Sequence, residues 1–257
     1  MPRALTLTAL EGIPLIAPGA GLARILHDCA RDMRMPFETG DVLVIAQKIV
    51  SKAEDRYLDL RTLTPSKRAL EIAAVVEKDP RFVEAVLMES SDIVRYQKNV
   101  LIVANRNGVV MANAGIDHSN IDNREDGDNV LLLPADPDAS AVRLRRELLS
   151  LCGAEIAVII NDSSGRPWRN GIVGIAIGVA GLTALQDLRG EPDLFGRRLE
   201  VTESATADEL ASAASLLQGQ GAQGQPVVLI RGFHPPKTAA HSRATALVRD
   251  RRTDMFR

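Results

Sequence analysis

A polar stretch at residues 161–169 carries the side chains best suited to chemistry in this sequence. It reads Asn-Asp-Ser-Ser-Gly-Arg-Pro-Trp-Arg and directly follows a short apolar run. Asp162 and Ser163 offer hard oxygen ligands for a divalent metal. Arg166 and Arg169 are permanent cations that can hold a phosphate or a carboxylate through paired N–H groups. The combination indicates metal-assisted phosphate chemistry, with an ordinary Asx turn beside a packed corner as the alternative.

A second polar cluster occupies residues 113–120, with the sequence Asn-Ala-Gly-Ile-Asp-His-Ser-Asn. Asp117, Ser119 and Asn120 are again oxygen donors at the exit of a predicted strand. His118 could act as a base or a ligand, but a single histidine without an evident partner is more often an ordinary hydrogen-bonded residue. We therefore assign no role to His118.

Two lysines follow the apolar run 42–46, in the stretch Gln-Lys-Ile-Val-Ser-Lys that begins at Gln47. Lys48 and Lys52 could contact phosphate as point charges, although lysines at the end of a strand are usually solvated. Neither the G-x-x-x-x-G-K-[ST] loop nor the G-x-G-x-x-G fingerprint occurs in the chain. The two common phosphate-binding loops are therefore excluded.

The composition is that of a globular chain of 257 residues, with 46% hydrophobic and 25% charged residues. The formal net charge of -2, and the lack of a basic run with interleaved aromatic residues, argue against a nucleic-acid partner. Cys29 and Cys152 lie in apolar helical contexts, which predicts buried free thiols rather than a disulfide or a zinc site. Neither a signal peptide nor a membrane span is predicted, so we expect a cytoplasmic protein without a membrane partner.

The elements that must position these polar stretches are apolar runs and amphipathic segments. We expect strands at residues 4–10, 42–46, 92–95, 100–104, 109–112, 131–134, 157–160 and 226–231. We expect helices at 21–33, 139–152 and 206–218, and two more within 65–91 that Pro80 separates. The pattern predicts an α+β fold with mixed and antiparallel sheets and flanking helices. We assign residues 1–257 to one domain, built as a single unit or as two intimately joined subdomains.

The connecting regions carry weaker signals. We expect a turn directly after Ile160, and close strand packing or a bend in the sheet over 171–181, where glycines are spaced along the chain. We also expect an acidic loop at residues 122–128 and a loop with little core at 185–199. From residue 235 onward we expect a peripheral tail with a weak helical tendency.

Taken together, the polar stretches resemble the coenzyme F-420 ligase family, whose members join L-glutamate to coenzyme F-420-0 with GTP. Each matching stretch is weak alone, but five in the family's order are specific. They are Gly12-Ile13-Pro14-Leu15-Ile16, Val50-Ser51-Lys52-Ala53-Glu54, Asn113-Ala114-Gly115-Ile116-Asp117 with Ser119-Asn120, Asp162 with Gly165-Arg166-Pro167-Trp168-Arg169, and Gly219-Gln220.

The resemblance implies the family's ligase fold, an intertwined homodimer, and no C-terminal flavin-binding domain. It also implies that Asp117 and Asp162 hold one divalent metal, and that Ser163 and Gln220 help to hold a second. These oxygen ligands suit Mg²⁺ or Mn²⁺, and potassium is an additional ion in the family. The implied nucleotide contacts come from a turn, two lysines and a glycine-rich loop: Gly12, Ile13, Pro14, Leu15, Gln47, Lys48, Lys52, Asn120, Gln218, Gly219, Gln220 and Gly221.

The implied reaction is activation followed by aminolysis. The terminal carboxylate of the deazaflavin precursor attacks the γ-phosphorus of GTP, and the amine of glutamate then displaces phosphate from the acyl phosphate. Asp162 is the expected catalytic metal ligand, and chemistry rather than the resemblance suggests Arg166 and Arg169 as grips for a substrate anion. Gln47-Lys48 and Asp55 depart from the family's pattern. An amide ligase for another acid and amine, a metal-dependent phosphohydrolase and a non-catalytic nucleotide-binding regulator therefore remain alternatives.

Overall fold

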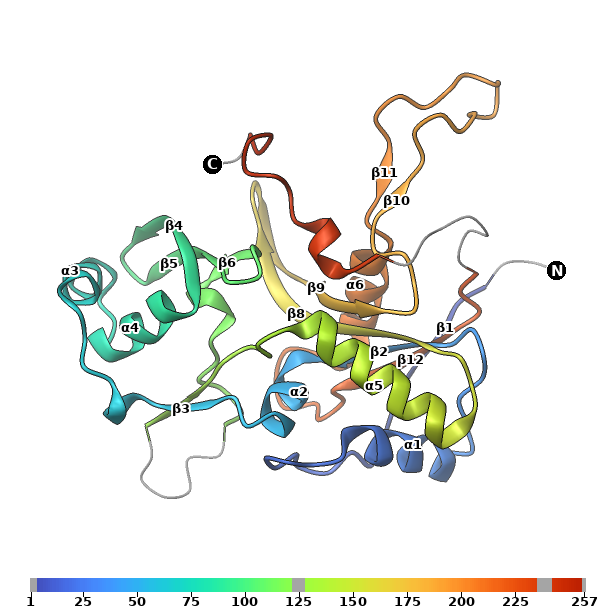
Figure 1. The fold of residues 1–257 in the computed structure, drawn as a ribbon, viewed down its shortest axis with the longest axis horizontal. Helices are drawn as coiled ribbons and strands as arrows, with labels where there is room; N and C mark the ends of the chain where they lie inside the picture. The colour runs from blue at the N-terminus through green and yellow to red at the C-terminus, as the bar shows by residue number, and fades with distance from the viewer. Residues whose placement is uncertain (1–3, 122–127, 235–241, 256–257) are drawn as a thin grey trace.

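A five-stranded mixed sheet forms the centre of the computed structural model, which describes residues 4–121, 128–234 and 242–255 (Figure 1). The strand order is β1-β12-β2-β8-β9. Only β2 and β8 are parallel neighbours, and the other pairs are antiparallel. The strands are β1 (Thr6–Ala9), β12 (Val227–Arg231), β2 (Val42–Ala46), β8 (Ala157–Arg166) and β9 (Arg169–Ala180).

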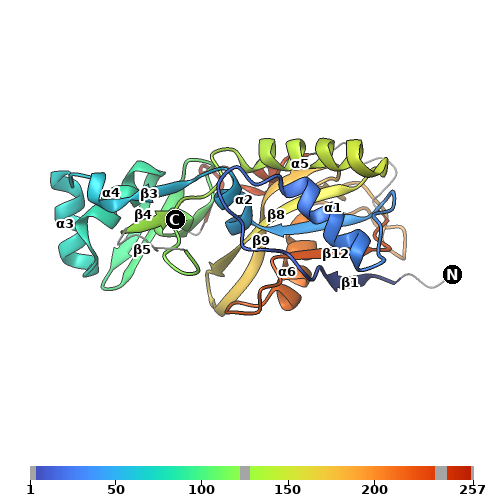
Figure 2. The same cartoon turned by 90° about the horizontal axis from the view of Figure 1, so that it is seen from below.

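Helices cover both faces of this sheet (Figure 2). Helices α1 (Leu22–Asp32) and α5 (Pro137–Cys152) pack on one face, and α6 (Thr206–Gln218) packs on the other. Alternate residues of each strand point to opposite faces, so Leu43 joins the α1 and α5 side while Val44 joins the α6 side. The predicted α+β class, with a mixed sheet and flanking helices, is confirmed.

The spaced glycines of β9 let helices approach the strand from both faces. A Cβ on Gly174 would lie 2.5 Å from the carbonyl oxygen of Ala211 in α6. On Gly178 it would lie 2.3 Å from the carbonyl oxygen of Pro137 in α5. No side chain fits at either position, so these glycines set how closely the helices and the sheet pack.

Residues 57–121 and 128–131 form an inserted lobe beside the central sheet (Figure 1). Its two ends pair antiparallel as β3 (Tyr57–Asp59) and β7 (Asn129–Leu131). The lobe has its own hydrophobic cluster, to which Phe82, Leu101 and Val103 contribute. Its remaining elements are a short 3₁₀ turn (Leu60–Thr62), α3 (Lys67–Val76), α4 (Pro80–Met88), β4 (Ser90–Gln97), β5 (Val100–Asn105), β6 (Val110–Ala112) and a second 3₁₀ turn (Asn113–Gly115).

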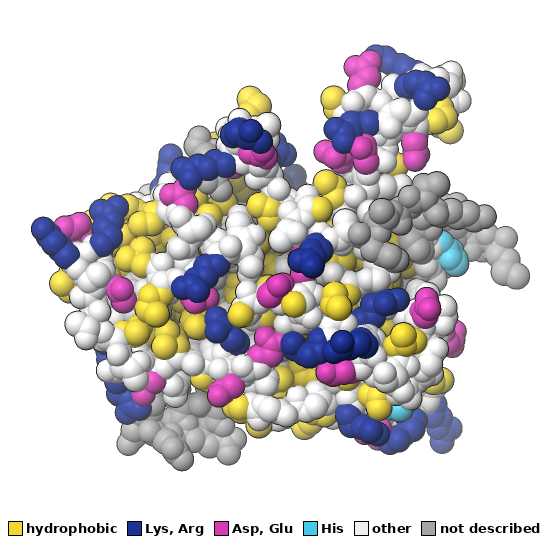
Figure 3. Space-filling model, in the orientation of Figure 1, with side chains coloured by type: hydrophobic (Ala, Val, Ile, Leu, Met, Phe, Trp, Pro, Cys, Tyr) yellow, Lys and Arg dark blue, Asp and Glu magenta, His cyan; other side chains and the backbone are white. Residues whose placement is uncertain are grey.

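An arm formed by residues 186–204 projects from the body (Figures 1 and 3). Its base is the short antiparallel pair β10 (Gln186–Asp187) and β11 (Glu203–Ser204). Leu194 and Phe195 in the arm are almost fully exposed. The arm therefore agrees with the prediction of a loop with little core. In the described parts of the chain, each helix is too short or too polar to cross a bilayer.

Several predicted elements are confirmed. The helix over 206–218 has the predicted bounds, and Pro80 separates α3 from α4. The strands expected at 100–104 and 109–112 are β5 and β6, which Asn107-Gly108 joins in a hairpin. Both cysteines are free and partly buried, as expected. Most of the acidic segment 122–128 lies outside the described residues.

Other expectations were wrong. The turn expected after Ile160 is absent, because residues 161–165 continue β8 by pairing with 172–176 of β9. Residues 47–53 form a helix, α2 (Gln47–Ala53), rather than a solvated strand end. The strand expected at 131–134 runs from Asn129 to Leu131.

The chain near its C-terminus is not peripheral throughout. A 3₁₀ turn at Ala244–Leu247 packs against the α6 side of the sheet, and Ala244 is buried. The backbone N–H of Ala244 donates to Asp138 Oδ1 at 2.9 Å, and the hydroxyl of Ser242 accepts from the N–H of Ala184 at 2.8 Å. These contacts lie far apart in sequence, so the weak local periodicity gave no sign of them.

Candidate functional site

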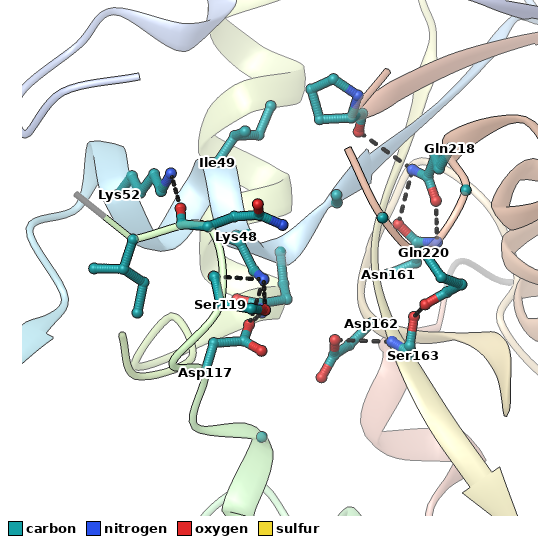
Figure 4. Close-up of a pocket in the computed structure, with 18 of the residues that line it drawn as sticks. Lys48, Ile49, Lys52, Asp117, Ser119, Asn161, Asp162, Ser163, Gln218 and Gln220 are labelled. Carbon is teal, nitrogen blue, oxygen red and sulfur yellow. Dashed lines mark hydrogen bonds and ion pairs between the residues drawn. The ribbon is translucent and has the colours of Figure 1, made fainter. Parts of the chain in front are cut away.

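A cavity of about 920 Å³ lies where the body of the protein meets the inserted lobe (Figure 4). It opens at the carboxyl end of β2 and along residues 161–165 of β8, a strand that extends beyond β2 and here carries a predicted polar stretch. Its walls come from segments that are distant in the chain: 13–16, 46–49 with Lys52, 111–121, 161–165 and 218–226.

The parallel pairing of β2 with β8 brings two of the predicted polar stretches together. Ala46 pairs with Asn161, so Gln47 and Asp162 follow at neighbouring positions on the same edge of the sheet. Helix α2 begins at Gln47 and directs Lys48 and Lys52 toward the cavity. The residues that follow β2 and the second half of β8 thus supply one wall.

The facing wall holds Asp117, which the lobe delivers. Its backbone N–H and C=O both bond to Leu131, and this isolated bridge fixes the segment. Oδ2 of Asp117 accepts a hydrogen bond from Gln47 Nε2 at 2.7 Å and lies 3.3 Å from Lys48 Nζ. The buried hydroxyl of Ser51 donates to Gln47 Oε1 at 3.0 Å, so the Gln47 amide has a fixed orientation toward Asp117.

The turn that leads to Asp117 has a left-handed backbone. Asn113, Ala114 and Gly115 have φ of 52°, 56° and 76°. Consecutive left-handed residues are strained when they carry side chains, and such strain is commonly found at functional sites. Lys78 Nζ, from the α3–α4 connection, donates to Asn113 Oδ1 at 2.8 Å. Burial lowers the pKa of Lys78. The hydrogen bond from Lys78 to Asn113 is one of the restraints that hold the turn.

Asp162 lies opposite Asp117 (Figure 4). Burial, reinforced by the negative charge of Asp117, raises the pKa of Asp162 to about 7. The N–H of Ser163, which donates to Asp162 Oδ1 at 2.8 Å, and the nearby Lys48 and Gln47 act in the opposite direction. A buried carboxyl group whose ionisation is opposed by a neighbouring carboxylate favours a bound cation.

Both lysines contact the segment that follows Asp117. Lys48 Nζ donates to the carbonyl oxygen and the hydroxyl of Ser119, at 3.1 and 3.2 Å. Lys52 Nζ donates to the carbonyl oxygen of Asn120 at 2.6 Å. The lysines therefore connect α2 to the lobe and at the same time give this wall its positive charge.

The last wall is the loop after α6. Gly219 has a φ of 70° and ends the helix, and residues 219–222 line the cavity. The hydroxyl of Ser163 donates to Gln220 Oε1 at 2.8 Å, which joins this loop to β8.

Most of the predicted site residues lie on this one cavity. They are Ile13, Pro14, Leu15, Gln47, Lys48, Lys52, Asp117, Asn120, Asp162, Ser163, Gln218, Gly219, Gln220 and Gly221. Gly12 is outside the lining, in the exposed turn beside Ile13. Arg166 and Arg169 are also outside it. They pair across the β8–β9 hairpin, on either side of Pro167 and Trp168.

Asn161 and Lys78 have roles in the site that the sequence did not predict. Asn161 lines the cavity and Lys78 holds the turn before Asp117. The signal for Asn161 is its i, i+2 spacing with Ser163, which places both side chains on one side of a strand. That signal can be used only when β8 is known to continue past Ile160. His118 packs its ring against Phe82, with centroids 4.7 Å apart.

In residues 4–121, 128–234 and 242–255, no group of three or more His, Cys, Asp and Glu side chains could hold a metal. The donors on the cavity are instead two carboxylates and neutral oxygens. Ser163 Oγ and Gln220 Oε1 lie 2.8 Å apart. Neighbouring ligands of an octahedral Mg²⁺ ion with bonds of about 2.1 Å are separated by about 3 Å. In this structure Ser163 and Gln220 bond to each other, and together with the two carboxylates they are oxygen donors of the kind that hard divalent ions prefer.

Comparison with known proteins gives consistent matches. Residues 12–232 match the family model described as F-420-0:gamma-glutamyl ligase. The chain is 45% identical over 253 residues to coenzyme F-420:L-glutamate ligase of Methanothermobacter thermautotrophicus, covering 98% of this chain and 99% of the relative. It is 46% identical over 225 residues to the protein of the same name from Archaeoglobus fulgidus, covering 88% of this chain and 86% of the relative.

Proposed function

The chain belongs to the F-420-0:gamma-glutamyl ligase family, and we propose that it catalyses the GTP-dependent ligation of L-glutamate to coenzyme F-420-0 in the cytoplasm, a step of coenzyme F-420 biosynthesis. The products are the glutamyl amide, GDP and phosphate. The observation that carries the proposal is the single cavity on which two facing carboxyl groups, Asp117 and Asp162, lie beside Lys48 and Lys52.

The nucleotide would lie along the wall made by α2, the turn at residues 13–16 and the loop after α6. Lys48 and Lys52 supply positive charge for phosphate oxygens, and the glycines of the loop allow backbone N–H groups to approach a phosphate closely. Asn120, whose carbonyl is held by Lys52, closes this side. The lack of a P-loop or dinucleotide fingerprint is compatible with this wall, because no single loop supplies the contacts.

Asp117 and Asp162 would hold one Mg²⁺ or Mn²⁺, and Ser163 and Gln220 would contribute to a second, with potassium as an additional ion. Bound there, such ions neutralise the triphosphate and the developing charge on the transferred phosphoryl group. The raised pKa of Asp162 supports this assignment. The ionised form of this carboxyl group is unfavourable without a partner, and a bound cation would stabilise it.

The chemistry then needs no side-chain nucleophile. A carboxylate oxygen of the acid substrate attacks the γ-phosphorus, and the bond from that phosphorus to the β–γ bridging oxygen breaks to release GDP. The free amine of glutamate attacks the acyl carbon, phosphate leaves with the electron pair of the C–O bond, and the amine gives up a proton. The walls of the cavity hold the two acceptors near each other and exclude water from the acyl phosphate.

We further propose that the chain works as a homodimer. Large apolar side chains are exposed on the arm and on the β8–β9 hairpin, including Phe195, Val201 and Trp168. Exposed apolar groups of this kind mark protein interfaces. Arg166 and Arg169 lie at the tip of this hairpin, outside the lining of the cavity of their own chain. They remain candidates for binding a carboxylate or phosphate of the substrate.

The test is mass spectrometry of the deazaflavin after incubation with coenzyme F-420-0, L-glutamate, GTP and Mn²⁺. A mass gain of whole glutamyl units that requires GTP, and that ATP in a parallel reaction does not replace, is expected. GDP release without either acceptor would favour the metal-dependent phosphohydrolase. A gain with a different acid or amine only would keep the ligase chemistry and change the substrates.

A further inference from the structure

Asn161 makes a reciprocal amide pair with Gln218 (Figure 4). Asn161 Nδ2 donates to Gln218 Oε1 at 2.8 Å, and Gln218 Nε2 donates to Asn161 Oδ1 at 3.1 Å. Asn161 is buried, with 4% of its surface exposed. A buried amide that uses donor and acceptor together is strongly fixed, because losing one partner leaves the other unsatisfied.

The same pair fastens both ends of the loop at residues 219–225. Gln218 is the last residue of α6, and its Nε2 also donates to the carbonyl oxygen of Pro226 at 3.2 Å. The loop therefore leaves and returns at one point, and that point is anchored to β8 by Asn161. A flexible glycine-rich segment becomes a closed loop whose base has a fixed position.

Asn161 also sits between the two halves of the site. Its side chain faces the loop, whereas the next residue, Asp162, faces Asp117 across the cavity (Figure 4). Two residues further along β8, Ser163 returns to the loop side and bonds to Gln220. Adjacent residues of one strand thus set the position of the loop and of the carboxyl group.

We propose that Asn161 is a positioning residue for the nucleotide: through Gln218 it holds the loop at residues 219–225 against the phosphate end of the cavity. The inference rests on the proposed function, because it takes this loop as part of the nucleotide wall. Asn161 acts through Gln218 and the loop. It is assigned no contact with the acid or with glutamate.

The variants Asn161→Ala and Gln218→Ala, singly and together, test this role. Each single variant should raise the KM for GTP by about tenfold, the effect of losing one well-made buried hydrogen bond. The KM for glutamate and kcat at saturating GTP should change by less than about twofold. The KM for GTP of the double variant should be no higher than that of the more impaired single variant, because both substitutions remove the same restraint.

Two further measurements separate positioning from general destabilisation. Asn170→Ala, at an exposed asparagine in the same hairpin, is the matched control and should leave all three constants unchanged. Amide hydrogen exchange should become faster in residues 219–225 of the Asn161 and Gln218 variants while the exchange of β2 and α5 stays as in the parent protein. If Asn161→Ala fails to fold, Asn161→Leu, which keeps the volume of the side chain and loses both hydrogen bonds to Gln218, gives the same readouts.

An unchanged KM for GTP in the folded variants would overturn the proposal, as would KM values that rise together for all substrates. Binding of a fluorescent GTP analogue to the parent protein distinguishes these failures from a failure of the proposed function. A parent protein that does not bind the analogue contradicts the function, whereas a parent and an Asn161 variant that bind it equally contradict only the role of Asn161.

Discussion

Gln47 Nε2 donates a hydrogen bond to Asp117 Oδ2 at 2.7 Å, and this contact joins the start of α2 to the inserted lobe inside the cavity. Gln47 is buried, and its Oε1 is occupied by the hydroxyl of Ser51. Both polar atoms of the Gln47 amide therefore make hydrogen bonds within the protein. The expected nucleotide contact by Gln47 remains a prediction, but the structure gives this residue a second task, which is to orient a carboxyl group.

Replacing Gln47 by Ala should weaken metal binding. Asp117 would lose a hydrogen bond to one carboxylate oxygen, and outer partners of metal ligands are typically worth about tenfold to a hundredfold in affinity. We expect the Mn²⁺ dissociation constant, measured by electron paramagnetic resonance, to rise by about tenfold. Gln97→Ala, at an exposed glutamine in β4, is the control. Equal Mn²⁺ affinities in parent and variant would remove this role from Gln47.

Metal binding should depend on pH with a midpoint near 7. Asp162 has a pKa raised to about 7, so below that pH a proton must leave before the carboxylate can bind an ion. The Mn²⁺ affinity should fall by about tenfold per pH unit below the midpoint and level off above it. Asp162→Asn should bind weakly at every pH. A parent protein whose affinity stays constant from pH 5 to 8 would contradict the assignment.

The same carboxyl group has a definite effect on the stability of the metal-free protein. Its pKa in the folded state is higher than the value of 3.8 for an unperturbed group, so the folded state binds more protons between 3.8 and about 7. Its contribution to stability is complete below that window and is lost as the pH rises through it. The increase in Tm caused by Mn²⁺ should therefore grow across this window, and the growth should disappear in Asp162→Asn.

Gly178→Ala should destabilise the fold strongly. The new Cβ would lie 2.3 Å from the carbonyl oxygen and 2.5 Å from the carbonyl carbon of Pro137, and these backbone atoms cannot move aside as the end of a flexible side chain could. Overpacking of this kind costs about 1–3 kcal/mol, and we expect the upper end in chemical denaturation. Gly165→Ala in β8 is a fair control, because its Cβ meets nothing within 4 Å. Equal unfolding midpoints for the two variants would show that α5 can move away from β9.

Lys78→Met should reduce ligation without a comparable loss of stability. The variant removes the bond to Asn113 and leaves the left-handed turn before Asp117 with one restraint fewer. We expect kcat/KM to fall by about tenfold, as for loss of a charge-assisted hydrogen bond that positions a ligand. Lys98→Met removes an exposed lysine that pairs with Glu77 and should have no effect. Identical steady-state kinetics in both variants would exclude this role for Lys78.

Local sequence signals predicted the elements whose stability is local. The helix at 206–218 has acidic residues in its first turn, a terminal glycine and regular apolar spacing, and each signal acts within a few residues. By contrast, the continuation of β8 through Asn161–Gly165 depends on pairing with β9. These residue types favour turns, and the partner strand overrides that preference. Helix α2 has only seven residues, which is too short for periodicity to reveal.

The sequence predicted which residues form the candidate site, but not the contacts between them. Oxygen donors and lysines were recognisable because their chemistry is local to each residue. The contacts between Gln47 and Asp117, between Asn161 and Gln218, and between Lys78 and Asn113 join segments far apart in the chain. Sequence alone gives no distance between such segments, so it grouped the cavity residues by resemblance only.

The order of strands in the central sheet also constrains when the protein can fold during its synthesis. Strand β12 lies between β1 and β2, although it follows them in the chain by nearly the whole length of the protein. During synthesis, β1 and β2 therefore lack β12, the strand that pairs with both of them, until residue 231 has left the ribosome. The inserted lobe is continuous in sequence and can assemble its own hydrophobic cluster long before that. Chaperones should act chiefly on the waiting strands, and a stop codon placed before β12 should give an aggregating product.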